Sequence, residues 1–323
     1  MHFPFKFAIV DLGTNSVRFD IYSLDSEKKV RRIHRERKMI RLGDGLYSHN
    51  ILSKGAIQRT VQAFLHIQQI LELFQVSRVR ILATSALRSA RNRNDLLRRI
   101  RKIGPLQIEI ISGAEEARLI AEGLLQSGSI PRGRFALIDI GGGSTEITFC
   151  QSKRLLKSYS LPLGALRLQQ MFLRTSPPKP RRGCADPIGS LRKHIAKMVK
   201  PLRYKARKTV TVLGSSGTIV SLEKVLRKNY AVVEPFGLQD LSNLVSVFEK
   251  MKEVEILSVP GVDYKRADIM LAGSMLLEEI MRQLNLKRVF VSKFALRDGI
   301  YDEEIRKIKT LLNLKSLPQL VNP

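Results

Sequence analysis

Short apolar runs alternate with amphipathic stretches along most of the 323-residue chain. Runs such as Phe7–Val10 and Val79–Ala83 predict buried strands. After Ser53, a residue type that caps helices, apolar residues recur at helical spacing as far as Phe74. Strand and helix patterns follow one another in this way toward the C-terminus. The alternation predicts an α/β architecture.

The stretch Ala136–Thr148, ALIDIGGGSTEIT, combines this pattern with chemistry. An apolar run ends at Asp139, the turn Gly141–Thr145 follows, and apolar residues resume after Glu146. Glycines adopt positive φ freely, so such a turn directs several N–H groups into one anion-binding concavity. Carboxylates beside a phosphate site hold a divalent cation. Taken alone, the motif is also compatible with a glycine-rich hairpin bearing solvated polar residues.

One further stretch repeats the pattern, and a third loop follows an apolar run without the aspartate. At the N-terminus Phe7–Val10 leads into Asp11 and the loop Gly13–Ser16, and the third loop, Gly214–Thr218, follows the apolar run Thr209–Leu213. We expect two similar half-domains, each offering a phosphate loop and an aspartate to a shared cleft. Three such loops in one chain are hard to explain as ordinary hairpins.

Six motifs occur in a fixed order: DLGTNSVR, ATSALRSARN, SGAEEARL, DIGGGSTE, GSSGT and RADIMLAGSMLLEEI. Together they resemble the exopolyphosphatase/guanosine pentaphosphate phosphohydrolase family, which belongs to the superfamily of actin, the sugar kinases and the heat-shock ATPase chaperones. The resemblance runs from about residue 7 to about residue 300. It implies two actin-like (ribonuclease H-like) α/β domains facing a cleft, expected at 1–130 and 131–323. Longer members carry a further helical metal-dependent domain; this chain resembles the short two-domain form.

The resemblance also implies catalytic residues. In SGAEEARL two glutamates open a helix, whose N-terminus favours negative charge. From sequence alone they are compatible either with first-turn glutamates that have no further role or with a general base, and the family pattern selects Glu116, not Glu115, as that base. Asp139 and Glu146 are the expected Mg²⁺ ligands, and Asp11 shares in orienting metal or water.

Phosphate oxygens are expected to meet the three loops and three arginines. Guanidinium groups match phosphate oxygens in a bidentate manner, although most of the 56 basic residues are solvated. In the family, the positions of Arg18 and Arg266 look like contacts for a guanosine polyphosphate. The expected substrate-binding residues are Gly13, Thr14, Asn15, Ser16, Arg18, Arg88, Gly141, Gly142, Gly143, Ser144, Thr145, Gly214, Ser215, Ser216, Gly217, Thr218 and Arg266.

Charge is the unusual feature of the composition. Lys and Arg number 56 against 29 Asp and Glu, a formal net charge of +27. Such an excess attracts polyanions: nucleic acid, an acidic membrane or a phosphate polymer. A basic bias on a solvated surface is the alternative.

No apolar run reaches the roughly 20 residues of a membrane span, the start has no signal-peptide pattern, and two cysteines form no disulfide framework. A cytoplasmic protein is expected.

The leading hypothesis is a Mg²⁺-dependent exopolyphosphatase that removes terminal orthophosphate from inorganic polyphosphate. The alternative is hydrolysis of guanosine pentaphosphate to the tetraphosphate, and both nucleotides are candidate ligands. A sugar or acetate-type kinase is a further hypothesis, against which the lack of a recognisable sugar-binding motif in this sequence weighs. A non-enzymatic polyanion binder does not need Asp11, Glu116, Asp139 and Glu146 together. No membrane or nucleic-acid partner is expected, and a homodimer is left open.

Overall fold

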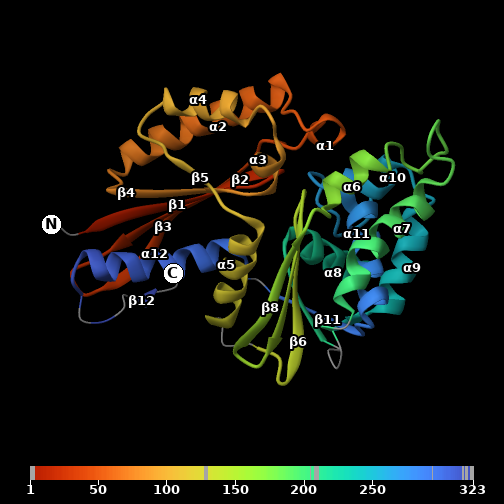
Figure 1. Ribbon diagram of the computed structural model, residues 1–323. Helices are drawn as coiled ribbons and strands as arrows, with labels where there is room; N and C mark the ends of the chain where they lie inside the picture. The colour runs from red at the N-terminus through yellow and green to blue at the C-terminus, as the bar shows by residue number, and fades with distance from the viewer. Residues whose placement is uncertain are drawn as a thin grey trace. The chain divides into compact units, whose positions relative to one another are not determined.

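The structure is a computed structural model that describes residues 4–126, 130–203, 205–206, 211–292, 294–314, 316 and 319–320 (Figure 1). Packing divides these residues into two compact units. Unit 1 comprises the described parts of 1–112 and 296–323, and unit 2 comprises those of 113–295. None of the described helices is both long enough and apolar enough to cross a membrane.

Unit 1 is built on a mixed sheet with the strand order β12-β3-β2-β1-β4-β5. The first three strands in sequence are antiparallel neighbours, and β4 and β5 continue parallel to β1. Its elements are β1 (Phe5–Leu12), β2 (Ser16–Leu24), β3 (Lys29–Met39), α1 (Leu46–His49), α2 (Lys54–Leu73), β4 (Arg78–Ala83), α3 (Ser85–Ser89), α4 (Arg93–Arg101), β5 (Ile108–Ile110), α12 (Leu296–Leu311) and β12 (Gln319–Leu320).

Helices cover both faces of this sheet, with α2 and α4 on one side and α12 on the other (Figure 1). The Ser53 hydroxyl accepts the N–H of Ala56 and caps α2, as the sequence predicts. On the other face, the fully buried carboxylate of Asp20 in β2 accepts hydrogen bonds from Arg35 of β3 and Arg297 of α12. These contacts attach the C-terminal helix to the first sheet.

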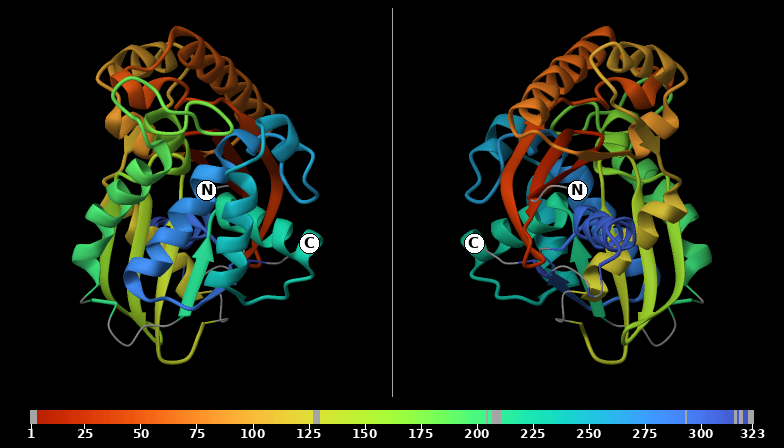
Figure 2. Two further views of the ribbon diagram at one scale, coloured as in Figure 1. Left: turned by 90° about the vertical axis from the view of Figure 1, so that its right-hand side faces the viewer. Right: turned by 90° about the vertical axis from the view of Figure 1, so that its left-hand side faces the viewer.

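Unit 2 repeats the plan with the strand order β10-β11-β9-β6-β7-β8. Helix α5 packs against β7 and β8, and the largely buried α11 lies among α6, α7, α8 and α9 (Figure 2). The elements are α5 (Gly113–Gln126), β6 (Arg134–Ile140), β7 (Thr145–Gln151), β8 (Arg154–Leu161), α6 (Ala165–Met171), α7 (Pro187–Val199), a 3₁₀ turn η1 (Lys200–Leu202), β9 (Thr211–Ser215), α8 (Gly217–Tyr230), β10 (Phe236–Gly237), α9 (Leu238–Phe248), α10 (Glu253–Leu257), α11 (Ala267–Leu284) and β11 (Arg288–Val291).

The same hairpin opens both sheets. The Gly13 N–H donates to the Ser16 carbonyl at 3.1 Å, and the Gly141 N–H donates to the Ser144 carbonyl at 2.9 Å. Each bond joins the first and the last residue of a four-residue hairpin loop between antiparallel strands. The predicted α/β fold is confirmed, and the internal repetition seen in the sequence is a repeated strand–loop–strand structure.

Some details differ from the expectation. A short helix, α1, lies within Leu42–Leu52, a segment whose glycines favour a loop. The packing units differ from the ranges 1–130 and 131–323 in α5, α12 and β12. Helix α5 packs on strands of unit 2, whereas α12 and β12 pack on the sheet of unit 1. Where the half-domains divide as folding units stays a prediction. Residues 209–210 of the strand predicted at Thr209–Leu213 lie outside the described residues.

Candidate active site

Asp139 and Glu146 are directly opposite each other in the antiparallel pair β6–β7. Residues in that relation point to the same face of the sheet. The outer strands extend the row: Ser215 of β9 is in register with Asp139, and Ser160 of β8 with Glu146. The Ser215 hydroxyl donates to Asp139 Oδ2 at 2.5 Å, and the Ser160 hydroxyl donates to Glu146 Oε1 at 2.8 Å. Two acids and two serines thus form one line across four strands.

Glu116 belongs to the same group. It lies in the first turn of α5, is 8% exposed, and its negative charge contributes to the raised pKa of Glu146. Glu115 is in a different environment, since Arg118 donates to both of its carboxylate oxygens and also pairs with Glu122. The charge of Glu116 therefore acts on Glu146, whereas the carboxylate of Glu115 is engaged by Arg118.

The environment of Glu146 disfavours its charged form. Burial is the largest cause, and the negative charges of Glu116 and Asp139 add to it, so the pKa of Glu146 lies well above its usual range. Hydrogen bonds from Ser160 and Ser144 act in the opposite direction. A divalent cation would relieve this repulsion. No three His, Cys, Asp or Glu side chains among the described residues could by themselves hold a metal ion.

The Gly141–Thr145 loop is held from behind by α6. The carbonyls of Gly141 and Gly142 accept the N–H groups of Ala165 and Arg167, and the Gly143 carbonyl accepts Arg167 Nε at 2.7 Å. In the described part of the chain, the N–H groups of Gly142 and Gly143 donate no hydrogen bond. N–H groups without an acceptor are compatible with an anion site, although the Gly143 nitrogen also lies next to Gly164, where a Cβ would be 2.4 Å from it.

Two residues of this segment have a structural use. Thr145 is fully buried and its hydroxyl donates to the Leu163 carbonyl at 2.6 Å, so that proton is engaged within the fold. Gly164 precedes α6, and a Cβ there would lie 2.4 Å from the Gly142 carbonyl oxygen. Only glycine lets α6 approach the loop so closely.

The third loop joins β9 to α8. Ser216 caps α8 by accepting the N–H of Ile219, with a φ of 98° that non-glycine residues rarely adopt. A Cβ on Gly217 would lie 2.2 Å from Arg266 Nη2, so the guanidinium rests directly on this loop. Arg266 is 8% exposed and lies 3.9 Å from Asp263. Arg266 and the loop Gly214–Thr218 are thus brought together within unit 2.

The remaining predicted residues belong to unit 1. Asp11 is buried, which raises its pKa, while the charges of Arg18 and Arg297 oppose the shift. Arg18 is its cross-strand partner, with Nη1 3.7 Å from Asp11 Oδ2. The Asn15 carbonyl accepts the N–H groups of Ile40 and Arg41, and the Thr14 carbonyl accepts the N–H of Gly43. This segment thus supports the first loop in the way that α6 supports the second. The first hairpin therefore pairs its aspartate with a cation, where the second pairs it with Glu146.

Arg88, in α3 of unit 1, donates Nη1 to the Ile111 carbonyl at 3.1 Å. Three residues with clear contacts to the second loop or its acids were not predicted: Ser160, Gly164 and Arg167. The period-two pattern of β8 could have put Ser160 on the same face as its neighbours in the sheet. Nothing in the sequence distinguishes Arg167 from the many other arginines.

A family model described as the Ppx/GppA phosphatase family matches residues 21–308. The structure of an exopolyphosphatase from Cytophaga hutchinsonii shares 23% identity over 96% of this chain and 99% of its own, with a TM-score of 0.81. The Ppx/GppA family member of Aquifex aeolicus shares 24% identity over 94% and 98%, with a TM-score of 0.73. At these identities the likeness establishes the fold.

Proposed function

Because the chain belongs to the Ppx/GppA phosphatase family, we propose that it is an exopolyphosphatase that releases terminal orthophosphate from inorganic polyphosphate. The observation that carries this proposal is the opposed pair Asp139 and Glu146, with the charge of Glu116 acting on Glu146, in a hairpin whose loop has N–H groups of Gly142 and Gly143 without an acceptor among the described residues. Phosphoryl transfer depends mainly on positioned groups and charge neutralisation. This part of unit 2 offers both.

In the proposed reaction, the Glu116 carboxylate accepts a proton from a water molecule. The water oxygen attacks the terminal phosphorus, and the bridging P–O bond breaks as the shortened chain leaves with its electron pair. The N–H groups of Gly142 and Gly143 donate to the oxygens of the transferred group. Backbone donors of this kind are fixed before the reaction and stabilise charge without reorganisation.

The donor set fits a divalent cation. Asp139 and Glu146 are opposed carboxylates; burial, and then the charges of Glu116 and Asp139, raise the pKa of Glu146, and a bound cation would offset this effect. Mg²⁺ usually takes one or two carboxylates and completes its shell with water and substrate phosphates, so two protein ligands suffice. When bound there, Mg²⁺ would neutralise charge on the phosphate. Ser160 and Ser215 orient the two carboxylates by donating their hydroxyl protons.

The other predicted residues keep proposed substrate roles. Arg266 and the third loop form a second group of phosphate donors in unit 2. In unit 1, the loop Gly13–Ser16, Arg18 and Arg88 are proposed phosphate contacts, and Asp11 orients water or metal. The contact between Arg266 and Gly217 also supports the alternative function, hydrolysis of guanosine pentaphosphate, because the family resemblance associates this arginine with guanosine polyphosphates.

Phosphate release with Mg²⁺, measured side by side on long-chain polyphosphate, short-chain polyphosphate and guanosine pentaphosphate, tests the proposal. Release mainly from polyphosphate supports an exopolyphosphatase. Release mainly from the nucleotide would replace it with the alternative function. Absence of release from all three would reject both.

A further inference from the structure

One long segment of unit 2 carries twelve lysines and arginines against one acid. From residue 174 to residue 208 the sequence contains a single acid, Asp186. The Asp186 carboxylate accepts the N–H of Gly189 and caps α7. The cations of this segment are Arg174, Lys179, Arg181, Arg182, Arg192, Lys193, Lys197, Lys200, Arg203, Lys205, Arg207 and Lys208.

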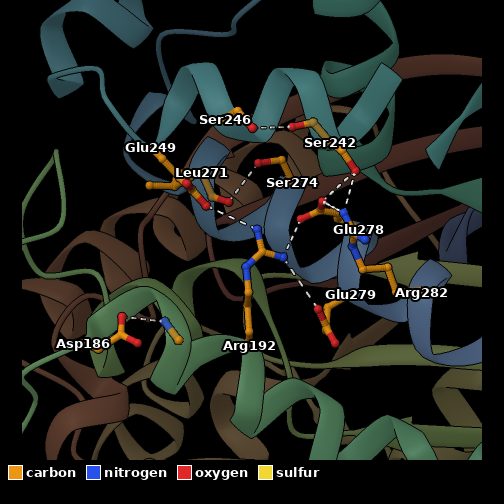
Figure 3. A network of polar contacts seen from close by, with 11 residues as sticks. Asp186, Arg192, Ser242, Ser246, Glu249, Leu271, Ser274, Glu278, Glu279 and Arg282 are labelled. Carbon is orange, nitrogen blue, oxygen red and sulfur yellow. Dashed lines mark hydrogen bonds and ion pairs between the residues drawn. The ribbon is translucent and has the colours of Figure 1, made fainter. Parts of the chain in front are cut away.

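The inner side of α7 is fixed by ion pairs as well as by apolar contacts (Figure 3). Arg192 donates Nη1 to Glu278 at 2.7 Å and Nη2 to Glu249 at 3.3 Å, joining α7 to α11 and α9. Glu278 also accepts from Arg282 and from Ser242. Glu278 and Glu249, the acids that contact α7, are therefore paired with arginines of the fold.

The outer side of α7 presents a line of lysines. Lys193 and Lys197 of α7 and Lys200, the C-cap residue of that helix, follow one another at helical spacing and are exposed. Seven residues of helix span about 10 Å. Within the described residues none of the three forms an ion pair. Because Arg192 fixes the rotation of α7, this lysine face (Lys193, Lys197 and Lys200) is held toward solvent.

Contacts connect the lysine face with the second phosphate loop. Arg167 of α6 donates to the Gly143 carbonyl at 2.7 Å. Farther along α6, Phe172 at its C-terminal end packs on the ring of His194 in α7, with centroids 5.2 Å apart. Burial first, and then the charges of Lys197 and Arg167, lower the pKa of His194. The charges of Arg167, which contacts the second loop, and of Lys197, on the lysine face, thus both act on His194.

We propose that the lysine face of α7 is an accessory binding site for the distal phosphates of a long polyphosphate chain whose terminal phosphate lies at the Gly141–Thr145 loop. The inference rests on the proposed exopolyphosphatase function. Each lysine that neutralises a phosphate releases condensed counterions, so affinity grows with the number of contacts and falls with salt. Only a polymer long enough to extend from the loop to α7 gains these contacts. The site therefore selects for chain length.

The test compares two triple variants of the full chain that remove equal charge. Lys193→Gln, Lys197→Gln and Lys200→Gln remove the lysine face. Lys224→Gln, Lys228→Gln and Lys250→Gln remove three other exposed lysines of unit 2 and serve as the control. Steady-state phosphate release is measured with Mg²⁺ on long-chain polyphosphate and on tripolyphosphate, at several salt concentrations.

For the lysine-face variant we expect KM for long chains to rise about tenfold and the slope of log affinity against log salt to decrease by about 2, as for three lost contacts. The kcat of the lysine-face variant and its KM for tripolyphosphate should stay within about twofold of the wild-type values. All kinetic values of the control variant should do the same. Unchanged KM for long chains, or an equal rise for tripolyphosphate, would overturn the proposal.

Two further outcomes separate the possibilities. If the wild-type protein releases no phosphate from any polyphosphate, the proposed function itself fails. If the lysine-face variant loses affinity for single-stranded oligothymidylate but keeps its KM for long polyphosphate, the surface binds nucleic acid and the accessory substrate site is rejected.

Discussion

Asp139 and Glu146 are cross-strand neighbours, and each accepts a serine hydroxyl from the next strand outward. The hairpin register fixes this arrangement, because a shift of one residue would turn one of the two carboxylates to the opposite face of the sheet. The turn that sets the register is also the loop with unused N–H groups. One hairpin therefore supplies both the acids and the anion donors of the proposed site.

The raised pKa of Glu146 predicts how stability depends on pH. Since the folded protein keeps the Glu146 proton above the ordinary value of 4.5, it binds more protons than the unfolded chain there, and stability falls as pH rises through this window. Without metal, Glu146→Gln should be more stable than wild type near neutral pH, and the difference should vanish below pH about 4. Urea unfolding in chelator across this range measures it. Parallel pH profiles would contradict the account.

Gly164→Ala tests the close approach of α6 to the second loop. A Cβ would lie 2.4 Å from backbone atoms of Gly142 and Gly143, so we expect a loss of about 1–3 kcal/mol of stability together with a large fall in phosphate release. Gly55→Ala is the matched control, because its Cβ would make only an ordinary contact with Arg59 at 3.4 Å. Equal behaviour of the two variants would remove the structural role of Gly164.

Arg192→Leu tests the network that orients α7. Burial alone would raise the pKa of Glu278, but hydrogen bonds from Arg282, Ser242 and Arg192 outweigh it and lower the pKa. Such a carboxylate stabilises the fold above its unfolded pKa, and the contribution is lost as pH falls through the folded value. We expect a loss of about 1–3 kcal/mol at neutral pH that shrinks in acid.

Arg227→Leu is the control for that experiment, since Arg227 forms an exposed i,i+4 pair with Glu223. Its cost should be at most about 0.5 kcal/mol at any pH. Unfolding by urea at neutral and acidic pH compares the two variants. A pH-independent cost of Arg192→Leu would show that apolar packing, and not the carboxylates, accounts for its effect.

Arg297→Met tests the attachment of α12 to the first sheet. The variant leaves the fully buried Asp20 with Arg35 as its remaining arginine partner, so we expect a loss of about 2–4 kcal/mol. Hydrogen exchange should increase in α12. Arg306→Met, at an exposed position of the same helix, should leave the free energy of unfolding and hydrogen exchange in α12 nearly unchanged. Larger effects of Arg306→Met than of Arg297→Met would contradict the proposed role of Arg297 in attaching α12.

Local patterns made much of this structure predictable. The glycine loops and their aspartates stand out because an apolar strand, an acid and a glycine turn are adjacent in sequence. Ser160 and Arg167 could not be ranked, because their importance depends on β8 register and on where α6 begins. Arg297 meets Asp20 across 277 positions of sequence, which no local pattern encodes. The pattern of Pro187–Met198 predicts an amphipathic basic helix, but the packing of Arg192 against α11 and α9 was needed to show which of its cations face solvent.

Glu116 and Glu115 offer the most direct test, since neighbouring glutamates in one turn differ in environment. Phosphate release from long-chain polyphosphate with Mg²⁺ is measured for Glu116→Gln and Glu115→Gln, and polyphosphate binding is measured separately. We expect Glu116→Gln to lower kcat by about 10²–10⁴-fold with binding retained, and Glu115→Gln to stay within about threefold of wild type. Near-normal turnover by Glu116→Gln would contradict the proposed water activation.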